Sequence, residues 1–169
     1  MRLASLPVLF LLSQACGRGH PPDASAARKA EAARDSAFRG VQARGAEVMG
    51  VDQYTSTHVF EPLPDGGRIE LQRDVPDSAG AAVIRQHMEH IAAAFGAGDF
   101  TLPGVVHARE VPGTAVMAAK RSAITYTVEA LPRGAALRLR TTDPEALQAI
   151  HDFLAFQRQD HHAGMHHGA

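Results

Sequence analysis

The chain has 169 residues and a formal net charge of −1 at pH 7, a length that suits one domain with a single core. A charge so close to zero gives no basic field of the kind that attracts nucleic acid or an anionic membrane surface. Apolar residues make up 45% of the sequence, but aromatic residues only 5%, with no tryptophan, so we expect a modest core. Histidine is in excess, since five of the ten histidines lie within the last 19 residues.

The N-terminus has the pattern of an export signal. Arg2 precedes an apolar stretch at 3–12, and small residues stand before Cys16, as in a cleaved signal peptide. The apolar stretch is short for a transmembrane helix. Cys16 is the only cysteine, and its place resembles the lipobox of bacterial lipoproteins, in which this cysteine is acylated. We therefore expect a signal peptide at 1–15, lipidation of Cys16, and a protein anchored by lipid in the periplasm or cell envelope.

Plain secretion stays open as an alternative to the lipid anchor. Lipoproteins usually carry leucine three residues before the cysteine, and here Ser13 stands at that position. The sequence Ser13-Gln14-Ala15 also suits cleavage by an ordinary signal peptidase. An uncleaved, buried N-terminal helix is the third interpretation.

A polar segment at 16–47 separates this leader from the rest of the chain. Its first residues include glycine and proline, and the remainder is rich in alanine, arginine and glutamate, which favour helix over 24–43. Phe38 and Val41 are its only large apolar residues, so we expect a marginal, exposed helix that acts as a tether. We expect an α+β domain at 48–160, followed by a tail rich in histidine and methionine at 161–169.

Alternation with period two predicts a β-hairpin at the start of the domain. Its strands are expected at 55–63 and 68–72, with a turn at 64–67. A loop of two or four residues is expected to pair Phe60 with Leu71, which places the large apolar side chains on one face. A three-residue loop would put Phe60 and Leu71 on opposite faces of the sheet.

An amphipathic helix is predicted to follow the hairpin. Its apolar residues recur at steps of four, three and four on one face: Ile84, Met88, Ile91 and Phe95. Residues that start helices lie at 74–77, and the helix is expected to end at Gly96 and Gly98. The segment 99–113 contains two prolines and two glycines, so we expect a loop there and a short helical turn at 114–120.

The second half of the chain repeats this pattern. A second hairpin is expected at 122–139, and Asp143-Pro144 predicts the start of a second helix. The apolar residues again face one way: Ile124, Tyr126, Val128, Leu137 and Leu139 in the strands, and Leu147, Ile150 and Leu154 in the helix. One β-β-α unit buries too little surface alone, so we expect both units to form one antiparallel four-stranded sheet with both helices on one face. Duplication and convergent patterning would both explain the repeat.

Histidines are the candidate ligands for a transition metal. His87 and His90 lie three residues apart on the predicted helix, so both imidazoles could reach one ion. His87 borders the apolar stripe, and His90 lies further toward solvent. His58 shares a sheet face with Phe60, the face that the helices should cover, so we expect it within reach of His87, with His90 or His107 completing the set. The alternative for each is an ordinary hydrogen-bonded residue at the edge of the core.

The C-terminal tail is the second candidate for metal binding. It combines imidazoles with a thioether in a short stretch: His161, His162, Met165, His166 and His167. Imidazoles beside a thioether suit copper, and imidazoles alone suit zinc or nickel. His151 is expected to lie in solvent. Because no histidine of the second half falls opposite His87 or His90, a duplicated site is not expected.

Sequence signatures of enzymes are absent. The chain contains no G-x-S-x-G elbow, no H-E-x-x-H helix and no glycine loop in the context of a phosphate site. No pair of carboxylates stands out as an acid and base. We therefore expect an envelope-anchored protein that binds or handles copper or zinc and is not an enzyme. A non-catalytic domain that binds a ligand, or a partner on its open, threonine-rich sheet face, is the alternative, and an enzyme is the third possibility.

The chain also resembles a family of small exported bacterial proteins. The segments that carry the resemblance cover nearly all of the mature part: RGAEVMG at 44–50, Thr57-His58-x-Phe60, Asp65-Gly66-Gly67, His87-x-x-His90-Ile91, Gly98-Asp99-Phe100, His107, Pro112-Gly113 and Asp160-His161. Some similar proteins carry the label aspartate carbamoyltransferase, but the Ser-Thr-Arg-Thr loop with which that enzyme binds carbamoyl phosphate does not occur here. The resemblance implies an exported domain and draws attention to His58, His87, His90 and His107, without implying an activity.

Overall fold

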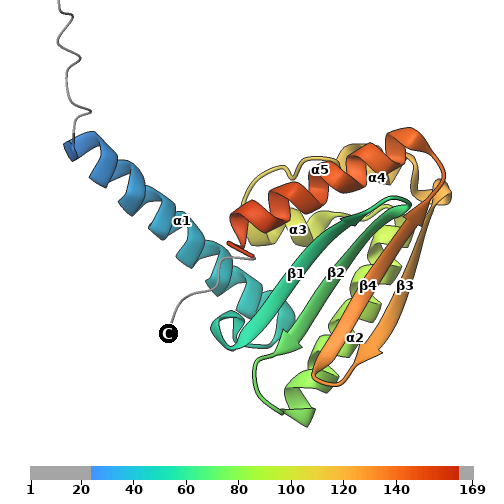
Figure 1. Ribbon diagram of the computed structural model, residues 1–169, viewed down its shortest axis with the longest axis horizontal. Coiled ribbons are helices and arrows are strands. Elements are labelled where there is room, and N and C mark those ends of the chain that lie inside the picture. Colours follow the sequence, from blue (N-terminus) through green and yellow to red (C-terminus); the bar gives the residue numbers. More distant parts are fainter. Residues whose placement is uncertain (1–23, 164–169) are drawn as a thin grey trace, which may run out of the picture.

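The computed structural model describes residues 24–163, which form a four-stranded antiparallel sheet with helices against one face (Figure 1). The strands are β1 (Ser56–Leu63), β2 (Gly66–Arg73), β3 (Ile124–Leu131) and β4 (Gly134–Thr141), in the spatial order β1-β2-β4-β3. The helices are α1 (Ala24–Met49), α2 (Ser78–Ala97), α3 (Thr101–His107), α4 (Thr114–Ala119) and α5 (Pro144–Asp160), with 3-10 turns η1 (Gln53–Thr55) and η2 (Arg121–Ala123). This architecture confirms the predicted α+β fold. The predicted signal peptide, Cys16, Met165, His166 and His167 lie outside the described residues.

The first hairpin has a loop of two residues, the shorter of the two predicted loop lengths. Only residues 64–65 lie between the strands, so Phe60 pairs with Ile69 and His58 pairs with Leu71. The predicted pairing of Phe60 with Leu71 is therefore wrong by two residues. Because side chains repeat every two residues along a strand, a shift of two keeps them on the same face. Phe60 and Leu71 are both buried beneath the helices, as expected.

The two β-β-α units make reciprocal hydrogen bonds across the centre of the sheet. The Arg73 amide donates to the Arg133 carbonyl at 2.9 Å, and the Thr141 amide donates to the Asp65 carbonyl at 3.0 Å. The two donor residues, Arg73 and Thr141, lie 68 positions apart in the sequence, and so do the two acceptor residues, Asp65 and Arg133. The turn of each hairpin therefore contacts the end of the other hairpin's inner strand, and the repeat in the sequence is also a repeat in space.

Two glycines occupy equivalent positions in the two units, since Gly66 is the first residue of β2 and Gly134 is the first residue of β4. A Cβ at Gly66 would lie 2.1 Å from the Leu139 carbonyl oxygen, and a Cβ at Gly134 would lie 2.0 Å from the Leu71 carbonyl oxygen. Real Cβ atoms do not approach backbone oxygens so closely. Each inner strand can therefore begin beside the other only because a glycine stands at its first position.

The units also exchange their helices. Helix α2 lies mainly over β3 and β4 of the second unit, whereas α5 lies over β1 and β2 of the first (Figure 1). Each hairpin is thus covered by the helix that belongs to the other. Helices α2 and α5 both lie on one face of the sheet, as predicted.

Helix α2 closely follows its sequence pattern. The Asp77 carboxylate accepts a hydrogen bond from the Gly80 amide at 2.9 Å as the N-cap, and the helix ends at Gly98. Its predicted stripe faces inward, with Ile84, Met88 and Phe95 buried. Ile91 is only partly buried, because it lines a cavity that is described below.

Helix α5 begins at its predicted cap, Asp143, whose carboxylate accepts hydrogen bonds from two amides in the first turn. Its buried face is wider than the predicted stripe: Ala146, Ala149, Ile150, Phe153, Leu154 and Gln157. Leu147 is only partly buried, because the helix turns its small alanines rather than Leu147 toward the core.

Helix α1 is longer than expected, and only its first half is exposed. Residues 24–37 are exposed, and this end projects away from the sheet (Figure 1). In the second half, Val41, Gln42 and Gly45 are buried, and this part contacts α3 and η1. Phe38 stacks on the His162 ring at 4.2 Å between centroids. No helix within residues 24–163 is both long enough and apolar enough to cross a membrane.

The predicted loop at 99–113 is wrong, because α3 occupies its centre. Pro103 is the third residue of this helix, where a proline needs no intrahelical amide partner and so does not disrupt the turn. The predicted short helix at 114–120 is present as α4.

The other face of the sheet is open and polar. Thr125 and Thr127 are exposed there, as expected for a threonine-rich face. Arg68 adds ion pairs to Glu129 at 2.5 Å and Glu70 at 3.1 Å. The open face therefore carries paired charges as well as hydroxyl groups.

Candidate binding pocket

A cavity of about 90 Å³ lies between the covered face of the sheet and the helices. Its wall is built by side chains from α1, η1, β1, β2, α2, α3 and α5, and most of them are apolar. The polar residues in this wall are Gln53, His58, His87, His107, Gln157 and His161. None of the residues that line the cavity is Asp, Glu, Lys or Arg.

His58 reaches the pocket from β1, on the face that the register predicted. Its ring stacks near Phe60, with 5.8 Å between centroids, and near His161, with 5.0 Å. Burial and, to a lesser extent, the His87 ring lower the pKa of His58 to about 4, although Asp74 acts in the opposite direction. The imidazole is therefore neutral at pH 7.

His161 was predicted as part of the tail, but it is the C-cap of α5 and forms part of the pocket wall. Its ring also meets the His107 ring edge to face, 5.1 Å between centroids. Its Nδ1 atom is buried and has no hydrogen-bond partner. Burial, with the neighbouring rings of His58, His107 and His162, lowers the pKa of His161 to about 2. The sequence held a signal for this placement, because the buried stripe at 150, 154 and 157 reaches His161 after four more residues.

His87 lines the pocket and His90 does not. Burial and the charge of His90 lower the pKa of His87 to about 4. His90 is exposed, as its helical phase indicated. The structure thus brings His58, His87, His107 and His161 to the wall of one cavity and leaves His90 outside it. Within residues 24–163, no group of three or more His, Cys, Asp or Glu side chains is arranged to hold a metal ion.

His107 is buried at the end of α3, and both of its ring nitrogens have partners. Nδ1 lies 2.5 Å from the Asp160 carboxylate, and Nε2 lies 2.9 Å from Gln157 Oε1. The other Asp160 oxygen accepts from Arg109 at 2.5 Å. His107 therefore connects α3 to α5 and closes one side of the pocket, and in this arrangement its ring has no nitrogen free for a ligand.

A buried amide that the sequence analysis did not single out also faces the pocket. Gln53 in η1 is 4% exposed. Its Nε2 donates to the Val51 carbonyl at 3.4 Å, whereas Oε1 has no partner. The amide packs against Gly45 of α1, where a Cβ would lie 3.2 Å from Oε1. A single glutamine carries no sequence pattern from which this role could be predicted.

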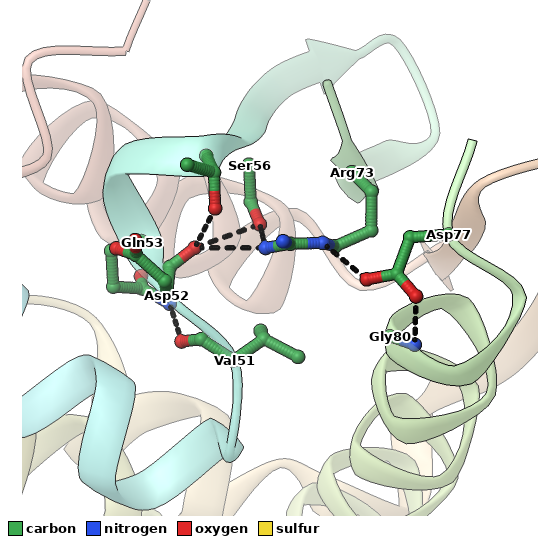
Figure 2. Close-up of polar contacts among 8 residues, drawn as sticks. Val51, Asp52, Gln53, Ser56, Arg73, Asp77 and Gly80 are labelled. Carbon is green, nitrogen blue, oxygen red and sulfur yellow. Dashed lines mark hydrogen bonds and ion pairs between the residues drawn. The ribbon is translucent and has the colours of Figure 1, made fainter. Parts of the chain in front are cut away.

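A polar network holds the turn that presents Gln53 (Figure 2). The Asp52 carbonyl accepts hydrogen bonds from the Ser56 hydroxyl at 3.0 Å and from Arg73 at 3.2 Å. Arg73 also forms an ion pair at 3.0 Å with Asp77, the N-cap of α2. The network therefore connects η1 to β1, β2 and α2, and fixes the backbone on both sides of Gln53.

His151 does not belong to the pocket, and the expectation that it lies in solvent is wrong. Its Nε2 lies 3.0 Å from the Leu63 carbonyl and 3.0 Å from the Gly66 carbonyl. The ring thus joins α5 to the turn of the first hairpin, and its role is structural.

The pocket offers apolar contact, neutral imidazoles and an unpaired amide oxygen. Comparison of the chain with protein-family models, curated proteins and solved structures found no match.

Proposed function

We propose that this protein is a non-catalytic binding module of the cell envelope that takes a small, uncharged, largely apolar ligand into the pocket. The observation that carries this proposal is the apolar wall around a 90 Å³ cavity, whose only polar lining residues are glutamines and histidines, with no Asp, Glu, Lys or Arg among them. Concave, mostly apolar sites with a few placed polar groups are typical of small-molecule binding. An apolar protein cavity of roughly 150 Å³ can bind benzene, and this cavity is smaller, at about 90 Å³, so we expect a ligand no larger than a single small ring.

The absence of charge among the lining residues argues against an ionised ligand. Moving an ion from water into such a wall costs several kcal/mol unless an opposite charge receives it, and no lining residue is Asp, Glu, Lys or Arg. A neutral ligand avoids this cost, and burying its apolar surface contributes roughly 25 cal/mol per Å².

A copper or zinc ion is the second candidate, and one observation favours it. The rings of His58 and His161 lie 5.0 Å apart, and both are held in the neutral form that metal ligation requires. Met49 and Met88 also line the cavity, and imidazole with thioether suits copper. A lipid anchor at Cys16 would keep either activity at the envelope.

The test uses the mature chain with Cys16→Ser, which cannot be acylated. Toluene is titrated while protein resonances are followed by NMR, and a matched pair of variants separates the pocket from the surface. Ile91→Phe fills the cavity, and Val105→Phe adds the same ring at an exposed position of α3. We expect saturable binding to the parent chain and to Val105→Phe, and loss of binding in Ile91→Phe. Absence of saturable binding to the parent chain would refute the proposal.

The metal candidate is tested on the same protein by metal analysis after exposure to copper and zinc. His58→Ala should reduce the bound metal if the pocket holds it. A chain ending at residue 163 keeps His161 but lacks the last six residues. Loss of metal in that chain alone would assign the metal to the terminal histidines instead.

A further inference from the structure

We propose that the pocket selects ligands that carry an O–H or N–H donor, which it binds at two buried acceptor atoms, Gln53 Oε1 and His161 Nδ1. This inference rests on the proposed ligand-binding function and adds the polar group by which the ligand is recognised. Both atoms are buried, both lack a hydrogen-bond partner, and both residues line the same cavity.

The orientation of the Gln53 amide follows from its surroundings. Its Nε2 faces the Val51 carbonyl at 3.4 Å and the Met49 sulfur at 4.0 Å. Reversing the amide would place its oxygen against the Val51 carbonyl oxygen, where neither atom can donate. Oε1 is therefore the unpaired end, and an amide oxygen can only accept a hydrogen bond.

The His161 ring is held in place on several sides. It caps α5 through its backbone amide, which donates to the Gln157 carbonyl at 3.0 Å, and it lies between the rings of His58 and His107. Because burial keeps its pKa near 2, the ring is neutral and has one nitrogen with a free lone pair. With the ring proton on Nε2, Nδ1 is a second acceptor beside the apolar wall.

The unpaired state of these atoms points to a ligand because buried acceptors are normally satisfied. Four side-chain atoms among residues 24–163 are buried without a partner: Gln42 Oε1, Gln53 Oε1, Tyr126 Oη and His161 Nδ1. Neither Gln42 nor Tyr126 lines the cavity. Gln53 Oε1 therefore favours a neutral donor over a carbonyl compound or an anion, both of which would repel this oxygen, and His161 Nδ1 can accept from the same donor when the ring proton is on Nε2.

Phenol and toluene provide a matched pair of probes, since they have the same number of heavy atoms and differ in the hydroxyl group. The dissociation constants of both are measured for the parent chain, for Gln53→Leu and for Gln42→Leu. We expect the preference for phenol over toluene to fall about tenfold in Gln53→Leu, as expected for one lost hydrogen bond. Gln42→Leu removes an equally unpaired buried amide outside the cavity and should leave the preference unchanged.

A second measurement on the parent chain does not depend on the folding of any variant. The side-chain amide resonances of Gln53 should shift clearly further with phenol than with toluene, because only phenol donates a hydrogen bond to this amide, and those of Gln42 should shift with neither. If both probes bind but the preference and the Gln53 resonances do not respond to the hydroxyl group, the donor assignment is overturned while the ligand-binding function stands. If neither probe binds to the parent chain, both proposals fail.

Discussion

Burial sets the charge of the histidines that line the pocket. His58, His87 and His161 each lose hydration, and the pKa values fall to about 4, about 4 and about 2. The rings also lie near one another, so a proton on one raises the cost of a proton on the next. At neutral pH these three imidazoles are therefore uncharged, and no Asp, Glu, Lys or Arg lines the cavity, which suits the proposed neutral ligand.

These lowered pKa values predict that acid destabilises the fold. In the unfolded chain the same histidines titrate near pH 6.5, so below that pH the unfolded state binds more protons than the folded state. The free energy of unfolding should fall as the pH drops from about 6.5 toward 4, by on the order of 1 kcal/mol per pH unit for each histidine. Urea denaturation at a series of pH values measures this slope.

His58→Phe supplies the control for this prediction, because it keeps an aromatic ring in the stack and removes the titrating group. The slope between pH 6.5 and 4 should be smaller in this variant. Asp77, Asp99 and Asp143 also have lowered pKa values, but they lose their contribution below the unfolded value of 3.8, outside this window. Equal slopes in the parent and the variant would mean that His58 is already hydrated in the folded protein.

At the scale of single elements, α5 contributes most directly to the core over β1 and β2. Leu154 is fully buried, and its Cδ1 lies 2.2 Å from where a Cβ at Gly67 would stand. Truncation of Leu154 to alanine should lower the free energy of unfolding by about 2–5 kcal/mol, because the tight packing around it cannot close the void. Leu147→Ala removes the same atoms from a partly buried position and should cost clearly less. Similar losses in chemical denaturation would contradict the packing described here.

Helix α3 ends at a residue whose backbone conformation favours glycine. Ala108 has φ 52° and ψ 33° in the left-handed region as the C-cap, where a Cβ is strained. Ala108→Gly should therefore raise the melting temperature, with a gain of up to about 1 kcal/mol in the free energy of unfolding. Ala82→Gly, at an exposed position inside α2, is a matched control that should lower stability by about 0.5–1 kcal/mol. A destabilised Ala108→Gly would show that the strain is relieved in solution.

Local periodicity was enough to predict the sheet, its covered face and helices α2 and α5, because burial repeats every two residues in a strand and every three or four in a helix. It could not set the hairpin register, since a shift of two residues leaves every side chain on the same face. Helix α3 was missed because Pro103 and Gly104 resemble the residues of a loop. Gln53 was missed, and His161 was assigned to the tail, because the pocket exists only where α1, η1 and α5 meet, far apart in the sequence.

At the scale of the whole molecule, the two β-β-α units and α1 contribute different parts of the structure. The reciprocal contacts between the hairpins close the sheet, and the exchanged helices cover it. The second half of α1 completes the pocket through Gly45, Val48 and Met49, whereas its first half projects outward. Cys16, the predicted lipidation site, precedes that projecting end in the sequence.

The proposed lipid anchor at Cys16 predicts that the protein is found in the membrane fraction. Cys16→Ala should release it from the membrane fraction, and the variant should keep the circular dichroism spectrum and melting temperature of the folded domain, because residue 16 precedes every described element. Fractionation of cells that express each form, followed by detection of the protein, measures this. A parent chain that is already free in the periplasm or medium would favour plain secretion.

The central claim, that the cavity receives a small neutral ligand, is tested most directly by intermolecular NOEs between bound phenol and the protein. We predict contacts from the phenol ring to methyl groups of Val48, Ile91 and Leu102, which line the cavity from three different helices. We also predict that these contacts disappear in Ile91→Phe. NOEs confined to exposed side chains such as Val75 and Val105, or no NOEs at saturating phenol, would contradict the account.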